Sequence, residues 1–223
     1  MTIKALIFDF DGLILNTETT MLRSWEEIFA EYGITVSLVE WASLLGTSMD
    51  PPAAYEMIEK HIGEPIDRES IRARRSQREL EMLKSEEVMP GVVNLITAAK
   101  VRGLRLGVAS SSDRKWVIGH LKRLGLHIHF ESIRCADDVT HTKPYPDLYL
   151  AVLRDMGIQP DQAIGFEDSL HGVGAVKEAG IFCVAVPNDV TRHLPMLEAD
   201  LMVTSLEEMD LEEYIQMAQG RAQ

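Results

Sequence analysis

The chain has 223 residues, 46% of them hydrophobic, and its net charge of −13 argues against nucleic-acid binding, because proteins that bind nucleic acids neutralise phosphates with excess Lys and Arg. Cys135 and Cys183 lie far apart and make no disulfide framework, which fits the cytoplasm, where we expect the protein. Asp9 interrupts the first apolar run, and no apolar stretch approaches the roughly 18 residues of a membrane span, so we expect neither a signal peptide nor membrane binding.

An apolar run at residues 3–9 predicts a buried strand that leads directly into Asp9-Phe10-Asp11-Gly12. After it, apolar residues at helical spacing predict an amphipathic helix at residues 18–32, which ends near Gly33. More helical patterns follow at about 37–45, 52–62 and 67–84. The segment between the first strand and residue 84 is therefore predicted to be helical.

The pattern changes after Met89-Pro90-Gly91, where strands begin to alternate with helices. Strands are expected at residues 104–110, 129–134, 163–167, 181–186 and 201–203. Helices are expected at residues 91–102, 113–124, 146–156 and 170–179, and at the C-terminal end. This alternation is typical of βαβ units and a parallel sheet, to which the first strand would belong. We therefore predict a doubly wound, Rossmann-like α/β domain at residues 1–15 and 86–223, with an inserted α-helical domain at residues 16–85.

Polar residues follow the ends of several expected strands. We expect four such groups to share the carboxyl edge of the sheet: Asp9-Phe10-Asp11, Ser110-Ser111-Ser112, Lys143 and Glu167-Asp168. Taken separately, each group has a simpler explanation. Asp9-Phe10-Asp11-Gly12 could be a turn, the serines and Glu167-Asp168 could cap helices, and Lys143 could be a surface lysine. Taken together, they indicate phosphoryl transfer. Carboxylates can bind a hard cation such as Mg²⁺, a lysine and hydroxyl groups can hold phosphate oxygens, and one carboxylate can attack phosphorus.

These segments also resemble the four motifs of the haloacid dehalogenase superfamily. The motifs occur in the right order as Asp9-Phe10-Asp11-Gly12, Val108-Ala109-Ser110, Lys143-Pro144 and Gly165-Phe166-Glu167-Asp168-Ser169. The resemblance covers essentially the whole chain, and the helical insert resembles that family's small α-helical cap. It implies a Mg²⁺-dependent phosphatase of the β-phosphoglucomutase-like subgroup, which acts on small-molecule phosphate monoesters. We expect a monomer, with a dimer as the alternative.

The resemblance also assigns catalytic and metal-binding roles. Asp9 would be the nucleophile that forms an aspartyl-phosphate. Asp11 would protonate the leaving alcohol and then take a proton from the attacking water. Mg²⁺ would be held by the Asp9 side chain, the Asp11 backbone carbonyl and Asp168, with Glu167 as a further ligand, direct or through water.

Phosphate binding would fall to residues of the second and third motifs. Ser110 and the backbone N–H of Ser111 would hold the transferring phosphoryl group. Lys143 would bridge the nucleophile and the phosphate and offset their mutual repulsion. These roles agree with the chemistry inferred from the residues alone.

Two departures from the family pattern argue against a phosphomutase, which is the main alternative. Mutases of this type carry a His in the helix after the first motif, where this chain has Met21. They also carry an Arg in the insert that holds a second phosphate, where this chain has Met49 after Gly46-Thr47-Ser48. The usual Asp before Thr-Glu is Asn16, which we interpret as a hinge or rim contact.

Further alternatives are a true haloacid dehalogenase and a non-catalytic phosphate-binding module of the response-regulator receiver type. The presence of Asp11 and Asp168 disfavours a dehalogenase, which needs neither a general acid for an alcohol nor a metal. A receiver has no helical insert and does not carry its phosphoacceptor on the first strand. Outside the motifs, we expect His127 and His129, at the start of a strand, to be structural. The three tryptophans are expected to serve packing: Trp25, Trp41 and Trp116.

Overall fold

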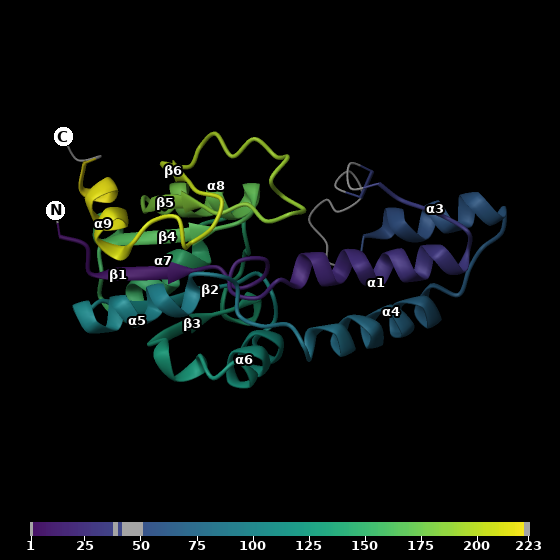
Figure 1. Cartoon of the computed structure of the whole chain (residues 1–223), viewed down its shortest axis with the longest axis horizontal. Helices are drawn as coiled ribbons and strands as arrows, with labels where there is room; N and C mark the ends of the chain where they lie inside the picture. The colour runs from purple at the N-terminus through teal and green to yellow at the C-terminus, as the bar shows by residue number, and fades with distance from the viewer. Residues whose placement is uncertain (1, 38–39, 42–50, 221–223) are drawn as a thin grey trace. The chain divides into compact units, whose positions relative to one another are not determined.

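The computed structural model describes residues 2–37, 40–41 and 51–220. The chain forms two compact units, one made of Met1–Leu15 with Glu87–Gln223 and the other of Asn16–Glu86 (Figure 1). We call them the sheet unit and the helical unit. None of the described helices is long and apolar enough to cross a membrane.

The sheet unit is built on a six-stranded sheet with the order β3-β2-β1-β4-β5-β6, in which every pair of neighbours is parallel (Figure 1). This order is that of a doubly wound, Rossmann-like sheet and confirms the predicted fold class. The strands are β1 (Ala5–Phe8), β2 (Arg105–Ala109), β3 (Ser132–Arg134), β4 (Ala163–Glu167), β5 (Phe182–Ala185) and β6 (Leu201–Met202). The helices are α5 (Val92–Arg102), α6 (Arg114–Arg123), α7 (Asp147–Met156), α8 (Leu170–Glu178) and α9 (Leu211–Gly220).

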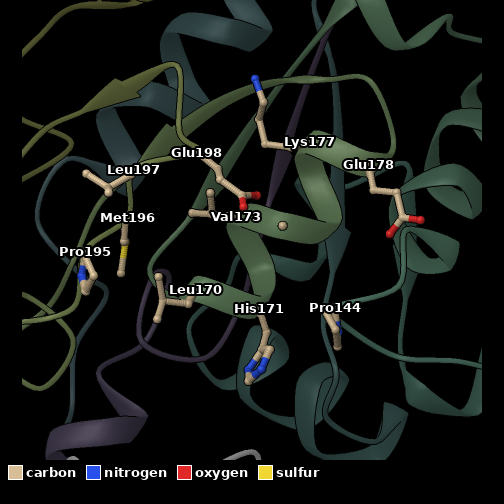
Figure 2. Close-up of a pocket in the computed structure, with 11 residues that line it drawn as sticks. Pro144, Leu170, His171, Val173, Lys177, Glu178, Pro195, Met196, Leu197 and Glu198 are labelled. Carbon is tan, nitrogen blue, oxygen red and sulfur yellow. The ribbon is translucent and has the colours of Figure 1, made fainter.

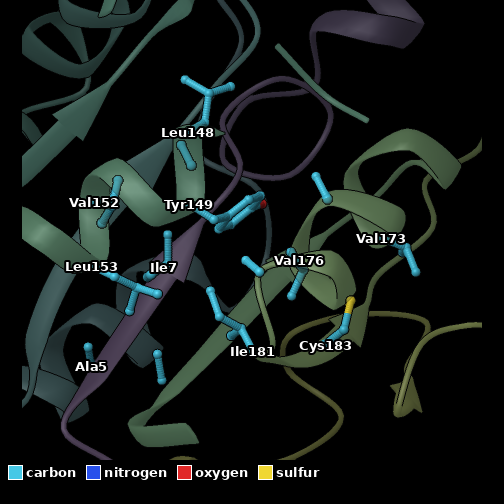
Figure 3. Packing of buried hydrophobic residues seen from close by; sticks show 14 of the residues in the cluster. Ala5, Ile7, Leu148, Tyr149, Val152, Leu153, Val173, Val176, Ile181 and Cys183 are labelled. Atoms are coloured by element: carbon cyan, nitrogen blue, oxygen red, sulfur yellow. The ribbon is translucent and has the colours of Figure 1, made fainter. Parts of the chain in front are cut away.

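The core of the sheet unit lies on both faces of the central strand β1, whose four residues are all buried. On one face, Ile7 packs in a cluster with apolar side chains of α7 and α8, such as Val152 and Val176 (Figure 3). On the other face, the Phe8 ring stacks on Phe166 with centroids 5.1 Å apart. Helices therefore cover the sheet on both sides, and only the strand ends can present polar groups to a ligand.

The helical unit contains α1 (Thr17–Glu31), α3 (Pro52–Ile62) and α4 (Arg68–Leu83). Asn16 caps α1 by accepting a hydrogen bond from the Thr19 N–H, and Asp67 caps α4 in the same way through the Ser70 N–H. The helices enclose a group of buried aromatic side chains, Trp25, Phe29, Trp41 and Tyr55. Trp25 and Trp41 are therefore packing residues, as predicted.

The predicted elements match the described ones closely, with one clear difference. A strand was expected at residues 129–134, but β3 covers only Ser132–Arg134, and His127–His129 form a 3₁₀ turn. The alternating apolar and polar residues there resemble a strand, yet the Ile128 side chain is 81% exposed and points away from the core. The helix expected at 37–45 lies partly outside the described residues, of which residues 40–41 are helical.

Candidate active site

The strand register brings three of the predicted motifs to one level of the sheet. Phe8 at the end of β1 pairs with Val108 of β2 on one side and with Phe166 of β4 on the other. Asp9 follows immediately and donates its backbone N–H to the Phe166 carbonyl at 3.0 Å. Asp9 therefore lies beside Glu167, because both residues come one position after a paired residue.

Three carboxylates meet at this edge. Asp9, Glu167 and Asp168 each offer an oxygen that lies within 4.8 Å of the other two, and the residues are only 5%, 0% and 1% exposed. Burial raises the pKa of Asp9 well above its usual value, and the charges of Glu167 and Asp11 raise it further against the opposing effect of Lys143. A compact set of hard oxygen donors that carries surplus negative charge fits a divalent cation such as Mg²⁺.

Lys143 supplies the positive charge within this cluster. Its ammonium group forms an ion pair with Asp9 and another with Glu167 Oε1 at 2.6 Å. It also lies 5.5 Å from the centre of the Tyr149 ring. Burial alone would lower the pKa of Lys143, but the charges of Asp9 and Glu167 outweigh it and raise that pKa above its ordinary value. Lys143 therefore stays charged beside the predicted nucleophile.

The Glu167 carboxylate is fixed from two further directions. Tyr149 of α7 donates its hydroxyl to Glu167 Oε1 at 2.5 Å, and burial raises the pKa of that phenol well above normal. On the other side α8 runs so close that a Cβ at Gly172 would lie 1.8 Å from Glu167 Oε2. Only glycine fits at this position. Tyr149 was not predicted as a site residue, because its helical spacing is typical of a core residue.

Asp168 is oriented by Asn188, which lies just beyond the end of β5. The Asn188 amide donates to Asp168 Oδ2 at 2.7 Å, while its own Oδ1 accepts the backbone N–H groups of Val190 and Thr191 at 2.9 and 3.1 Å. Gly12 allows this approach, since a Cβ there would lie 2.1 Å from Asp168 Oδ2. Asn188 was not predicted, although its place after a strand end was a signal of the same kind as the others.

The Asp11 carboxylate accepts hydrogen bonds on both of its oxygens. The Ser112 hydroxyl donates to Oδ2 at 2.6 Å, and the Ser110 hydroxyl lies 3.3 Å from the same atom. The indole N–H of Trp116, on α6, donates to Oδ1 at 2.9 Å. Trp116, which was expected to serve packing, packs on His120 and also contacts a predicted catalytic group through its polar atom. Ser111 is exposed at the same edge.

Haloacid dehalogenase-like hydrolases are the family whose model matches this chain, over residues 6–186. The chain belongs to this family. The candidate phosphatase YhcW of Bacillus subtilis is 45% identical, with 94% of each chain aligned. Fructose-1-phosphate phosphatase YqaB of Escherichia coli is 34% identical over 81% of this chain and 95% of its own. A mutant CbbY from Rhodobacter sphaeroides, solved in complex with xylulose-1,5-bisphosphate, is 30% identical and superposes with a TM-score of 0.74 over 95% of this chain and 98% of its own.

Membership of the haloacid dehalogenase-like hydrolases identifies the chain as an enzyme and disfavours the receiver-type alternative. Asp9, Lys143, Glu167 and Asp168 form one cluster at the strand ends, while Asp11 contacts Ser110 and acts on Asp9 through its charge. Ser112, from the predicted serine group, contacts Asp11, whereas the polar contacts of three further residues emerge only from the structure: Trp116, Tyr149 and Asn188.

A separate hollow of about 690 Å³ lies along α8 of the hydrolase (Figure 2). Its lining includes Leu170, His171, Met196 and Leu197. None of the three clustered carboxylates lines it, although it reaches Pro144, the neighbour of Lys143. The carboxylate cluster, and not this hollow, carries the groups that phosphoryl transfer needs.

Proposed function

We propose that the chain is a Mg²⁺-dependent phosphatase, which hydrolyses small-molecule phosphate monoesters through an aspartyl-phosphate on Asp9. One observation carries this proposal: Asp9 lies beside the Lys143 ammonium and shares a 4.8 Å cluster with Glu167 and Asp168. A nucleophile, a cation and additional metal-binding oxygens are the groups that this reaction requires.

In the first half of the reaction, the Asp9 carboxylate attacks phosphorus and the bond from phosphorus to the alcohol oxygen breaks. Asp11 gives its proton to that oxygen as it leaves. Lys143 lowers the repulsion between Asp9 and the phosphate, and the Ser110 hydroxyl and Ser111 N–H hold the phosphoryl oxygens. In the second half, water attacks the same phosphorus, Asp11 takes a proton from it, and inorganic phosphate leaves while Asp9 is restored.

Mg²⁺, when bound, supplies positive charge that neutralises the phosphate oxygens. Asp9, Asp168 and the Asp11 carbonyl would hold it, and Asn188 would orient Asp168. Glu167 adds its charge from a position fixed by Lys143 and by the Tyr149 hydroxyl. Its role would be to keep Lys143 in place and to complete the cation site, directly or through water.

A phosphatase is favoured over a mutase because the chain lacks two polar groups that would serve a bisphosphate. Met21 is a buried residue of α1, and its thioether offers no charged donor. Met49 lies outside the described residues, and as a methionine it too lacks such a donor. Water should therefore reach the aspartyl-phosphate before a hydroxyl group of a second sugar phosphate does. The similarity to YqaB and CbbY favours sugar phosphates as the substrate class to test first.

The test is a screen of the full chain against sugar phosphates and other small phosphate esters, with Mg²⁺ and with excess EDTA. We expect release of inorganic phosphate that EDTA abolishes and Mg²⁺ restores, because oxygen ligands hold Mg²⁺ only moderately. Activity that survives chelation, or release of halide from a haloacid, would contradict the proposal. ³¹P NMR of a hexose 1-phosphate with its bisphosphate separates the mutase: isomer that accumulates faster than inorganic phosphate would overturn the phosphatase.

A further inference from the structure

Trp116 differs from the other two tryptophans in what its indole nitrogen contacts. The Trp25 and Trp41 Nε1 atoms are buried without a hydrogen-bond partner among the described residues. The Trp116 Nε1 instead donates to Asp11 Oδ1 at 2.9 Å. Trp116 therefore has a specific polar contact with a residue of the proposed reaction.

The Trp116 ring is held in place by its neighbours within the sheet unit. Its backbone N–H donates to Asp113, the N-cap of α6, at 2.8 Å. Its ring meets His120 edge-on with centroids 4.5 Å apart, and His120 in turn lies 6.3 Å from the ring of Phe10. Phe10 is the residue between Asp9 and Asp11, so the same packing secures both ends of the Trp116–Asp11 contact.

We propose that Trp116 is a positioning residue, which fixes the Asp11 carboxylate so that Oδ2 is the oxygen that exchanges the proton. This inference rests on the proposed function. An indole N–H can only donate a hydrogen bond, so Oδ1 must accept it, and Oδ1 is the better acceptor while the proton is on Oδ2. Oδ2 faces the hydroxyls of Ser112 and Ser110, which can donate to an ionised oxygen or accept from a protonated one.

Asp11 Oδ2 loses a proton in the first half of the reaction and regains one in the second. A proton on Oδ2 passes to the alcohol oxygen as its bond to phosphorus breaks, and Oδ2 becomes ionised while Trp116 still donates to Oδ1. A proton from the attacking water then returns to Oδ2 when water adds to the aspartyl-phosphate. The Ser112 hydroxyl rotates between accepting and donating, and the Trp116 contact stays the same throughout.

The variant Trp116→Phe keeps an aromatic ring and removes the N–H. We expect kcat/KM, which reports the transfer of the phosphoryl group to Asp9, to fall about tenfold for an alkyl phosphate, the size expected for a lost hydrogen bond to a charged group. The fall in kcat/KM should be much smaller for nitrophenyl phosphate, whose leaving group needs no proton. Trp25→Phe is the matched control, because it removes an indole N–H that has no hydrogen-bond partner in the described part of the chain. The ratio of the two rates is unaffected by any loss of folded protein, since the same molecules hydrolyse both esters.

A double-variant cycle shows whether Trp116 acts through Asp11. In an Asp11→Asn background, Trp116→Phe should cause no further loss for the alkyl phosphate. Equal losses for the two esters, no loss at all, or additive losses in the double variant would each overturn the positioning role and leave the phosphatase intact. If the wild-type chain hydrolyses neither ester, the proposed function fails, and the inference falls with it.

Discussion

The two units use their charged residues in different ways. In the helical unit, the described ion pairs join oppositely charged side chains of its helices, as when Arg74 and Arg78 both pair with Glu31. In the sheet unit, Asp9, Glu167 and Asp168 are buried together, and Lys143 pairs with the first two. Such a group of like charges opposes folding, and its presence at the strand ends therefore indicates a function.

The difference is clearest for Lys143 and Arg75, whose side chains are each only 6% exposed. Arg75 pairs with Glu79 one turn further along α4 at 2.8 Å and lies 5.7 Å from the centre of the Trp25 ring. That pair is balanced and belongs to the core of the helical unit. Lys143 pairs with two carboxylates, those of Asp9 and Glu167, and lies at the strand ends, where we propose that the substrate binds. We therefore expect substitutions at Lys143 to affect catalysis and substitutions at Arg75 to affect stability.

The largest effect is expected from Lys143→Met, which keeps the length of the side chain and removes its charge. Without the ammonium group, Mg²⁺ alone would offset the repulsion between Asp9 and a phosphate. We predict a fall in kcat of about 10³–10⁵-fold, the size found for loss of a cationic group in phosphoryl transfer. Steady-state kinetics at saturating Mg²⁺ measures it. Retention of most of the activity would remove Lys143 from the proposed mechanism.

Asp11→Asn should come next, with a fall in kcat/KM of roughly 10²–10⁴-fold for an alkyl phosphate, the usual contribution of general acid–base catalysis. Substrate binding should hardly change. The loss should be smaller for nitrophenyl phosphate, because that leaving group departs without a proton. Equal losses for the two substrates would contradict the role of Asp11 as an acid.

Asn188→Ala should weaken Mg²⁺ activation by about 10–100-fold, as is usual when a group that orients a metal ligand is removed. The substitution takes away the amide that donates to Asp168 Oδ2 and leaves all the proposed ligands in place. The Mg²⁺ concentration that gives half-maximal activity is the measurement, and kcat at saturating Mg²⁺ should recover. Asp189→Asn, at the exposed next position of the same loop, is the control. An unchanged Mg²⁺ requirement in Asn188→Ala would separate Asn188 from the metal site.

The smallest catalytic effect is expected in the helical unit. Arg75→Met removes the cation paired with buried Glu79 and should lower the free energy of unfolding by about 3 kcal/mol. The kcat for nitrophenyl phosphate should be unchanged at a temperature where the variant stays folded. Replacing Glu79 with Leu in the same variant should restore much of the stability, since neither position of the former pair then carries a charge. A large loss of kcat in folded Arg75→Met would contradict the contrast between the two units.

The sequence was most informative where strands end. Asp9, Glu167 and Asp168 could be grouped in advance because parallel strands bring their carboxyl ends to one edge, and β4 was predicted with its observed bounds. Trp116 was missed because its contact depends on where α6 directs its first turn. Its place in the first turn of the helix that follows Ser110-Ser111-Ser112 was the available signal.

Tyr149 and the segment around His127 show a different limit. Tyr149 has the spacing of a core residue, and only the packing of α7 brings its hydroxyl to Glu167. The apolar and polar alternation at His127–His129 suits a strand as well as a surface turn. Local pattern cannot distinguish these cases, because the outcome depends on which neighbouring element covers the side chains.

The central claim is that Asp9 is the residue that becomes phosphorylated. The direct measurement is to mix the chain with a ³²P-labelled phosphate ester, quench in acid within one turnover and map the labelled peptide by mass spectrometry. We predict label on Asp9, a burst no larger than one phosphate per chain, and no label or turnover in Asp9→Asn with the fold retained. Label on Asp11 or any other residue, or turnover by Asp9→Asn, would contradict the account.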